Sequence, residues 1–355
     1  MSALPVPPTP APVHALDFDV LAALVGRAFP EATAGSLAQE AMPGGASTRR
    51  YFRVSLPSRT AVAMFVPDGA KPEEAAQAHG GTRWPFLEVR DLLASRGVDV
   101  PALYAEDTAR GWVLLEDLGD ATLAVHLGGY PGDRERLYVQ AVRDLARAQG
   151  ALEALPAGSV VSTRAFDEEL LLWEIHHFRE WALDARGIAL TAADRATFDA
   201  VAARLARRIA SWPRSFVHRD YQSRNLMVRP GGGLCWIDFQ DALLGPRVYD
   251  LVALLNDSYQ VFDRPFVEAR LDDYALARGL GRNELGAIVR EFDLVTVQRK
   301  LKDAGRFVFI DRVKGNPKFL EFVEPTIAKV RASLARLTDD EDMRALADVL
   351  ARTLP

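Results

Sequence analysis

One segment, VHRDYQSRNLMVRPGGGLCWIDFQ at residues 217–240, limits what this 355-residue chain can fold into more than any other. Within it LMVR, PGGG and LCWI each have four residues, which predicts a β-hairpin with a four-residue loop. The register that pairs Arg229 with Leu234 also places Asn225 opposite Asp238, with Cα atoms roughly 4.5–5.5 Å apart. An amide and a carboxylate at that spacing predict a site for a hard cation such as Mg²⁺, which prefers a few protein oxygens together with phosphates and water.

The start of the segment adds a candidate base. In HRDYQSRN, Asn225 follows Asp220 by five residues, and Asp238 follows Asn225 by 13. This spacing matches the H-R-D-L-x-x-x-N catalytic loop and the later D-F-G of kinases. Phosphoryl transfer needs a carboxylate that orients and deprotonates the attacking hydroxyl, and metal ions that neutralise the phosphates. An HRD triplet alone would be ascribed to chance, but loop, spacing, hairpin and second aspartate together predict Asp220 as catalytic base and Asn225 and Asp238 as metal ligands.

The charge balance and the first residues exclude several classes of protein. The chain has 43 basic and 48 acidic residues, a formal net charge of −5, so its overall field opposes non-specific nucleic-acid binding. Residues 1–17 contain five prolines and no lysine or arginine, which predicts a disordered tail and no signal peptide. No stretch approaches the roughly 18 apolar residues of a membrane span. We therefore expect a cytoplasmic protein without nucleic-acid or membrane partners, and the sequence does not predict its oligomeric state.

The secondary-structure pattern changes near residue 120. Before it, YFRVSL and TAVAMFV flank a PSR turn and predict a hairpin, VPALYAED and GWVLLED predict two more strands, and PFLEVRDLLAS predicts a helix on this small sheet. After it, the sequence predicts a helix over residues 166–183 and another that begins after Thr191, with Asp194 completing a capping box. The chain is thus predicted to contain a tail at 1–17, a β-rich lobe at 18–118 and a mainly helical lobe at 119–355.

The segment at residues 217–240 and its continuation to Tyr259 resemble the catalytic segment of the aminoglycoside phosphotransferase superfamily, two-lobed relatives of protein kinases. ASTRRYFRV, LLLWEIHHFREWAL and VQRKLKDAGRFVFIDR are similar to the bacterial anomeric sugar kinases of cell-wall (peptidoglycan) recycling. The resemblance implies an α+β, protein-kinase-like fold with a small antiparallel-sheet N-lobe and a larger helical C-lobe. It also implies transfer from ATP, with Mg²⁺, to the C1 hydroxyl of N-acetylmuramate or N-acetylglucosamine.

The resemblance assigns nucleotide binding to the small lobe. GGASTRR, at residues 44–50, precedes the first long strand, where this fold places the loop that covers the phosphates. Its glycines permit close backbone approach, and its hydroxyls and amides can donate to phosphate oxygens. The chain leaves this lobe at a hinge whose backbone binds the adenine edge in this fold. The candidate ATP-binding residues are Ser47, Thr48, Arg49, Arg50, Glu116 and Leu118.

The lysine that protein kinases carry on the next strand is absent. AVAM stands in place of V-A-I-K, so Met64 occupies the position of the lysine. The sugar kinases that the chain resembles also tend to lack it, and Arg49, Arg50 or Arg53 could supply the positive charge instead. Glu88 occupies the position of the lysine's usual partner, and without the lysine we expect it to be a surface or structural carboxylate.

The resemblance also implies roles for polar residues of the helical lobe. Asp250 matches a superfamily aspartate that we expect to brace the catalytic loop. The candidate residues for binding the small-molecule sugar acceptor are Glu174 on the tryptophan-rich helix, Asp257 in an apolar helix, and Arg224 in the catalytic loop.

Two other functions stay open on the sequence alone. An aminoglycoside, choline-like or other amino-alcohol kinase usually needs a cleft dense in carboxylates, and the helix predicted over 166–183 carries both acidic and basic residues. A nucleotide-binding pseudokinase scaffold would explain the missing lysine. Such a protein, however, has no reason to keep Asp220, Asn225 and Asp238 as a set.

Overall fold

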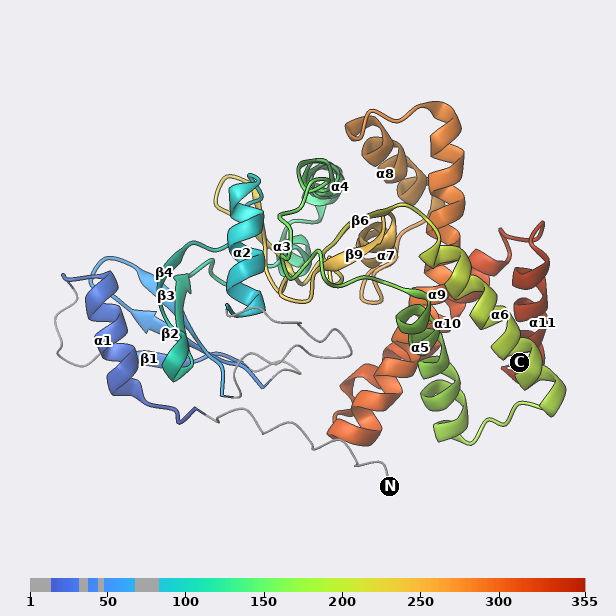
Figure 1. Cartoon of the computed structure of the whole chain (residues 1–355), viewed down its shortest axis with the longest axis horizontal. Helices are drawn as coiled ribbons and strands as arrows, with labels where there is room; N and C mark the ends of the chain where they lie inside the picture. Colours follow the sequence, from blue (N-terminus) through green and yellow to red (C-terminus); the bar gives the residue numbers. More distant parts are fainter. Residues whose placement is uncertain (1–13, 32–37, 44–47, 68–82, 355) are drawn as a thin grey trace, which may run out of the picture.

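The computed structural model describes residues 14–31, 38–43, 48–67 and 83–354, and it has two lobes (Figure 1). A small lobe of sheet and helices precedes a larger lobe made mostly of helices, as predicted. Most of the predicted tail at residues 1–17 lies outside the described residues, and so does Ser47. Within the described ranges, no helix has the length and apolar character that a membrane crossing requires.

The small lobe is a five-stranded antiparallel sheet with a helix on each face. Leu114 lies in the apolar cluster that includes α1 (Phe18–Ala28), whereas its neighbour Val113 lies in the cluster that includes α2 (Pro85–Ser95), because successive side chains of a strand point to opposite faces. The predicted hairpin, the other two strands and the predicted helix are confirmed. The strand order is β1-β2-β3-β5-β4, with bounds β1 Gln39–Ala41, β2 Arg50–Ser55, β3 Thr60–Phe65, β4 Leu103–Asp107 and β5 Trp112–Glu116.

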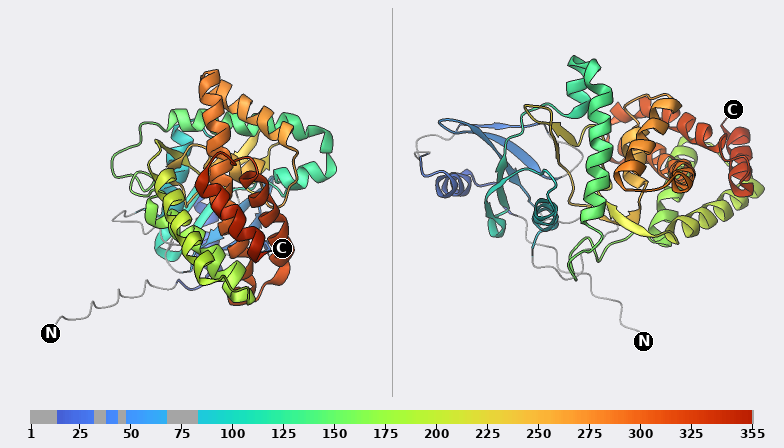
Figure 2. Two further views of the ribbon diagram at one scale, coloured as in Figure 1. Left: turned by 90° about the vertical axis from the view of Figure 1, so that its right-hand side faces the viewer. Right: turned by 90° about the horizontal axis from the view of Figure 1, so that it is seen from above.

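The large lobe is organised around the long helix α9, which contacts α5, α7, α8 and α10. Thr191 caps α6 as predicted, and its side-chain oxygen accepts from the amide of Asp194 at 3.1 Å. Figure 2 shows α6 and α11 at the end of the molecule away from the small lobe. The helix bounds are α3 Leu123–Gly129, α4 Arg134–Ala151, α5 Glu168–His177, α6 Ala192–Ala210, α7 Tyr249–Leu255, α8 Arg264–Ala277, α9 Arg282–Lys314, α10 Val323–Leu334 and α11 Glu341–Thr353.

The helix predicted over residues 166–183 is not continuous. α5 ends at His177, and Phe178–Leu183 continue as a π-helical turn. This turn packs against α9 at Gly305, where a Cβ atom would collide with the carbonyl group of His177. The missing side chain of Gly305 therefore permits a very close helix contact. That contact comes from a distant part of the chain, so the local apolar pattern could not indicate it.

Two short antiparallel strand pairs hold the catalytic segment. β6 (Arg214–Val217) pairs with β9 (Leu243–Pro246), and β7 (Leu226–Val228) pairs with β8 (Leu234–Trp236). The second pair is the predicted hairpin. Both pairs belong to the large lobe, on the side that faces the small lobe (Figure 1).

The register of this hairpin differs by one residue from the predicted register. Val228, rather than Arg229, pairs with Leu234. The same register sets Asn225 opposite Ile237, whose amide donates to the Asn225 carbonyl at 3.0 Å. The prediction that Asn225 lies directly opposite Asp238 is therefore wrong.

The turn explains the shift in register. The amide of Arg229 donates to the carbonyl of Gly233 at 2.8 Å, so the loop has three residues rather than four. Gly231 and Gly232 have φ angles of 94° and 93°, which glycine adopts without the steric cost of a side chain. At the other end of the hairpin, Asp238 has a φ of 64°, so the chain changes direction at that residue.

Candidate active site

The catalytic loop runs between β6 and β7, and a buried aspartate holds it. Asp250, on α7, accepts hydrogen bonds from the backbone amides of His218 (2.6 Å) and Arg219 (3.0 Å). Arg219 has a φ of 80°, in the left-handed region that a long side chain adopts only at a cost. Burial raises the pKa of Asp250 to about 7. The two contacts confirm that Asp250 braces the loop.

Asp220, the predicted base, is held by two contacts and is partly exposed. Its Oδ1 lies 3.3 Å from Nη2 of Arg299, on α9, and its carbonyl oxygen accepts from Nδ2 of Asn225 at 2.8 Å. Its side chain is 39% exposed. Burial alone would raise the pKa of Asp220, but the charges of Lys302, Arg299 and Arg219 outweigh burial and lower the pKa below its usual value. Asp220 is therefore ionised near neutral pH and open to a ligand.

His218 is a structural residue in this loop. Its ring packs edge-on against Tyr221 and Trp236, and its Nε2 lies 3.1 Å from the carbonyl oxygen of Ile237. Burial lowers the pKa of His218 to about 4. The ring is thus neutral at physiological pH, and it lines neither of the two cavities described below.

Asp238 and Asn225 line the same cavity despite the change in register. Nε2 of Gln240 donates to Oδ1 of Asp238 at 3.0 Å, and Nη1 of Arg49 lies 3.7 Å from the same oxygen. Burial and the charge of Asp220 raise the pKa of Asp238 above its usual value. The Asp238 side chain is 45% exposed, so its carboxylate is accessible from the cavity.

This cavity, called here the interlobe cavity, lies between the small lobe and the catalytic segment. Its volume is about 510 Å³, within the roughly 300–1,000 Å³ typical of small-molecule sites. The predicted hinge residues Glu116 and Leu118 line it. Much of the remaining lining is apolar and comes from both lobes, including Tyr51, Val62, Phe86, Leu115, Met227, Ile237 and Phe239. An apolar slot beside a hinge backbone suits a planar base.

The predicted nucleotide-binding residues differ in where their side chains lie. Thr48 and Arg50 are exposed and do not line the interlobe cavity, whereas Arg49 reaches Asp238. The carboxylate of Glu116 is bound by Arg229, with Nη1 2.7 Å from Oε1, and this bond lowers its pKa. The backbone of the hinge, rather than the Glu116 side chain, is therefore the part left for a ligand.

The lysine and glutamate of protein kinases have no ion-pair counterpart here. Met64, at the position of the lysine, is fully buried in the apolar core. The Glu88 side chain accepts a hydrogen bond of 2.5 Å from the backbone amide of Val160. Glu88 thus links α2 to the large lobe, which confirms its expected structural role.

Among the three arginines expected to replace the lysine, Arg49 has the best position. Arg53 is bonded to two carboxylates, with Nε 2.8 Å from Asp117 and Nη2 2.8 Å from Asp120. Arg49 has a side chain only 10% exposed and lies beside Asp238. Its positive charge is therefore next to the candidate metal site.

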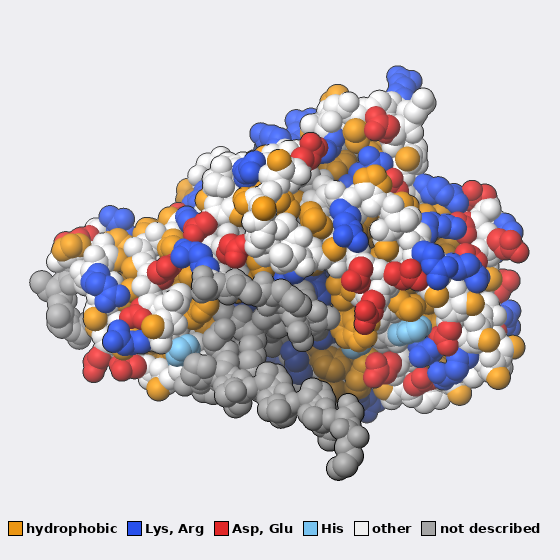
Figure 3. Space-filling model, viewed as in Figure 1, with side chains coloured by type: hydrophobic (Ala, Val, Ile, Leu, Met, Phe, Trp, Pro, Cys, Tyr) orange, Lys and Arg blue, Asp and Glu red, His pale blue; other side chains and the backbone are white. Residues whose placement is uncertain are grey.

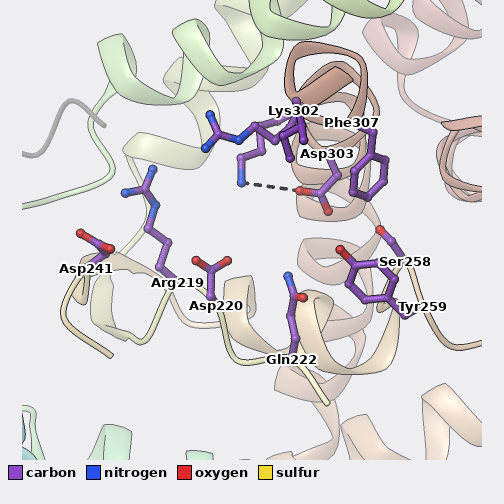
Figure 4. A pocket seen from close by; sticks show the side chains of 11 residues that line it. Arg219, Asp220, Gln222, Asp241, Ser258, Tyr259, Lys302, Asp303 and Phe307 are labelled. Carbon is purple, nitrogen blue, oxygen red and sulfur yellow. Dashed lines mark ion pairs between the residues drawn. The ribbon is translucent and has the colours of Figure 1, made fainter. Parts of the chain in front are cut away.

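A second cavity, called here the α9 cavity, lies between the catalytic loop and α9 (Figure 4). Its volume is about 160 Å³, which restricts it to a compact ligand or part of one. Figure 4 shows Asp220 and Arg219 entering it from the loop and Lys302 from α9. The full lining is Arg219, Asp220, Gln222, Asp241, Ser258, Tyr259, Lys302, Asp303, Arg306, Phe307 and Ile310.

Two of the predicted acceptor-binding residues line neither cavity. Glu174 is fully buried, and its Oε2 accepts from Tyr249 at 3.3 Å and from Gln298 at 2.8 Å. Asp257 is also fully buried and accepts from the hydroxyl of Ser223 at 2.6 Å. Both carboxylates therefore stabilise the large lobe. We do not retain either of them as an acceptor ligand.

The third predicted residue, Arg224, lies over the ring of Tyr259 and lines the interlobe cavity rather than the α9 cavity. Residues of α9 that the sequence did not single out lie around Asp220 instead. Arg299 contacts its carboxylate, and Lys302 and Asp303 line the α9 cavity with it. The available signal was VQRKLKDAGRFVFIDR, where several charges interrupt an otherwise apolar helix. Its charged residues become informative only when α9 is placed against the catalytic loop.

Residues 38–285 match the Phosphotransferase enzyme family. The chain belongs to this family. Two curated relatives are named N-acetylmuramate/N-acetylglucosamine kinase. The one from Pseudomonas putida KT2440 is 35% identical over 315 residues, which cover 87% of this chain and 86% of the relative. The one from Pseudomonas aeruginosa PAO1 is 34% identical over 297 residues, which cover 82% of each chain. The predicted class of enzyme, a phosphotransferase, is confirmed.

Solved structures confirm the two-lobed, protein-kinase-like fold. A choline/ethanolamine kinase family protein from Mesorhizobium loti has a TM-score of 0.59 and 16% identity, and the match covers 94% of this chain and 98% of that one. Aminoglycoside 2'-phosphotransferase-IIIa in complex with GDP has a TM-score of 0.58 and 16% identity, over 87% of this chain and 98% of that one.

Proposed function

We propose that this chain transfers the γ-phosphoryl group of ATP, with Mg²⁺, to the C1 hydroxyl of N-acetylmuramate or N-acetylglucosamine. The observation that carries the proposal is the position of Asp220. Its carboxylate lines the α9 cavity, and its backbone carbonyl is bonded to Asn225, which lines the interlobe cavity. A base at this junction can act on an acceptor in one cavity and face a nucleotide in the other. The names of the two Pseudomonas relatives support the choice of sugar.

The interlobe cavity suits Mg-ATP. The adenine would lie against the hinge backbone near Leu118, and Asn225 and Asp238 would hold the magnesium ion. Their oxygens fit a hard cation, and a bound dication would favour the ionised form of Asp238 over the protonated form that burial favours. Mg²⁺, when bound, would supply charge neutralisation for the phosphates. Arg49, beside Asp238, would bind a phosphate oxygen in place of the missing lysine.

In the α9 cavity, Asp220 orients the sugar and removes its proton. The C1 oxygen attacks the γ-phosphorus, the bond to the β–γ bridging oxygen breaks, and the hydroxyl proton passes to Asp220. The products are a sugar 1-phosphate and ADP. The C1 hydroxyl of a reducing sugar is more acidic than its other hydroxyls, because the ring oxygen withdraws electron density. Catalysis would therefore depend mainly on alignment and on neutralisation of phosphate charge.

The test compares N-acetylmuramate and N-acetylglucosamine with the same sugars capped as methyl glycosides at C1. Transfer from ATP should occur only to the free sugars and give an acid-labile 1-phosphate. Phosphorylation of the capped sugars, or an acid-stable 6-phosphate product, would contradict the proposed position. Binding of Mg-ATP without turnover of any sugar, aminoglycoside or amino alcohol would favour a scaffold instead.

A further inference from the structure

The α9 cavity has a buried lysine on the wall opposite the catalytic loop. The Lys302 side chain is 11% exposed, and Figure 4 shows it pointing from α9 into the space above Asp220. Arg219 points toward the same space from the loop. Figure 3 shows basic side chains deep in the hollow between the lobes. Positive charge therefore reaches the cavity from both walls.

One carboxylate is shared among the cations of this part of α9. Oδ2 of Asp303 lies 2.9 Å from Nζ of Lys300 and 3.9 Å from Nε of Arg299, and Oδ1 of the same carboxylate lies 3.5 Å from Nζ of Lys302. The shortest contact involves Lys300, so Lys302 has only a weaker share of a single negative charge. Burying a cation without a full counter-charge is unfavourable. An anionic group on the ligand would complete this cluster.

The other two carboxylates that line the cavity do not supply that charge. Asp220 is bonded to Arg299 and has to remain open to the acceptor hydroxyl. Asp241 lies beside Arg219, away from Lys302 (Figure 4), and burial raises its pKa. Among the described residues, Lys302 therefore interacts with Asp220 through charge but has no close ion pair on the side of the cavity that faces the acceptor.

We propose that Lys302 binds a carboxylate of the acceptor and makes the enzyme select an anionic amino sugar over a neutral one. This inference rests on the proposed function. N-acetylmuramate is N-acetylglucosamine with a lactyl ether, which carries a carboxylate a few ångströms from C1. In the proposed binding mode, the C1 hydroxyl is at Asp220 and that carboxylate points toward Lys302 on α9, the opposite wall of the cavity. Charge-assisted hydrogen bonds of this kind are among the stronger polar contacts in proteins.

The experiment measures kcat/KM of the wild type, Lys302→Met and Lys302→Arg for N-acetylmuramate, its methyl ester and N-acetylglucosamine. The wild type should prefer N-acetylmuramate to the ester and to N-acetylglucosamine by about 10-fold or more, the range of a hydrogen bond to a charged group. Lys302→Met should abolish this preference, and Lys302→Arg should keep most of it. The ratio between sugars is the readout, because any effect of the lysine on Asp220 changes all three substrates alike.

Lys318→Met, at an exposed position outside both cavities, is the matched control and should leave the ratios unchanged. An equal loss for all three substrates in Lys302→Met would overturn the inference. If Lys302→Met does not fold, the wild-type comparison of acid and ester decides, because equal kcat/KM values would also overturn it. A wild type that phosphorylates none of the sugars at C1 contradicts the proposed function itself, which is a distinguishable result.

Discussion

The buried guanidinium of Arg299 donates a hydrogen bond to the carboxylate of Asp220, with Nη2 3.3 Å from Oδ1. The same guanidinium donates from Nη1 to the backbone carbonyl of Arg219 at 2.8 Å and lies 4.6 Å from the centre of the Tyr249 ring. Helix α9 thus holds both the backbone of the catalytic loop, at Arg219, and the side chain of Asp220. This contact couples the wall of the α9 cavity to the proposed base.

Arg299→Met should impair the base without removing it. Because the Arg299 charge helps to lower the pKa of Asp220, its loss should raise that pKa and move the acid limb of the kcat profile to higher pH. Arg299→Lys, which keeps the charge, should restore most of the profile. Profiles are measured after a thermal melt confirms folding. An unshifted acid limb in a folded Arg299→Met variant would show that the contact is only structural.

Asp220→Asn separates chemistry from binding. The amide keeps the size of the carboxylate but cannot accept the hydroxyl proton, so kcat should fall by about 10²–10⁴-fold, the usual contribution of a general base. Mg-ATP binding, followed by calorimetry, should persist. Asp272→Asn, on the exposed face of α8, is the control and should behave as the wild type. Near-normal turnover of Asp220→Asn would remove Asp220 from the mechanism.

Asp238→Asn tests the metal site. Mg-ATP at about 100 times its dissociation constant should stabilise the wild type by roughly 2.7 kcal/mol, which corresponds to several degrees of melting temperature at roughly 2–4 °C per kcal/mol. Chelation of magnesium should remove most of this shift. Asp238→Asn should lose the magnesium-dependent part, since the ligand charge is gone. A variant that keeps the full magnesium-dependent shift would mean that Asp238 does not hold the ion.

Arg49→Met tests the replacement for the missing lysine. If Arg49 binds a phosphate oxygen, its loss should raise KM for ATP by about 10-fold or more, the range of a hydrogen bond to a charged group. KM for the sugar should stay close to the wild-type value. Arg50→Met is the matched control, because Arg50 is the exposed neighbour outside the interlobe cavity. Equal effects of the two substitutions would count against a specific role for Arg49.

Local patterns predicted the parts of this molecule that local physics determines. The strand alternation around Met64 and the cap at Thr191 need only neighbouring residues, and both elements are confirmed. The sequence spacing of Asp220, Asn225 and Asp238 also sufficed to predict that they lie near one another. Asp220 lines the α9 cavity, and the other two line the interlobe cavity. The lengths of the hairpin strands alone, however, could not show that the Gly231–Gly232 pair closes a three-residue loop, and the register was wrong by one residue.

Long-range packing determined what the sequence did not reveal. Glu174 lies in a helix with many apolar residues, where the same pattern fits either a ligand or a core group. The structure buries it, with Oε2 bonded to Tyr249 and Gln298 and Oε1 3.7 Å from Nη2 of Arg219. Lys302 follows Asp220 by more than 80 residues. Its approach to the loop depends on how α9 packs, including the close contact at Gly305. No local periodicity carries that information.

The buried ring of His218 should make the fold sensitive to acid. Burial lowers its pKa from about 6.5 to about 4 in the folded state, so between these values the unfolded chain binds a proton that the folded chain does not. The contribution of His218 to stability is therefore full above about pH 6.5 and is lost as the pH falls toward 4. The size of the pKa shift corresponds to about 3 kcal/mol. Asp250, whose pKa is raised to about 7, has the opposite slope over the same range.

His218 and Asp250 change the free energy of unfolding with pH in opposite directions, so the stability of the wild type alone does not reveal the effect of His218. The difference in stability between the wild type and a His218 variant does reveal it. His218→Gln keeps a donor for the Ile237 carbonyl and does not titrate. The free energies of unfolding of the wild type and the variant are measured by urea titration from pH 4.5 to 7.5. As the pH rises to about 6.5, the wild type should become more stable relative to the variant. Above that pH the difference between the two should stay constant. Curves that are parallel over the whole range would mean that His218 is protonated in the folded protein as readily as in the unfolded chain.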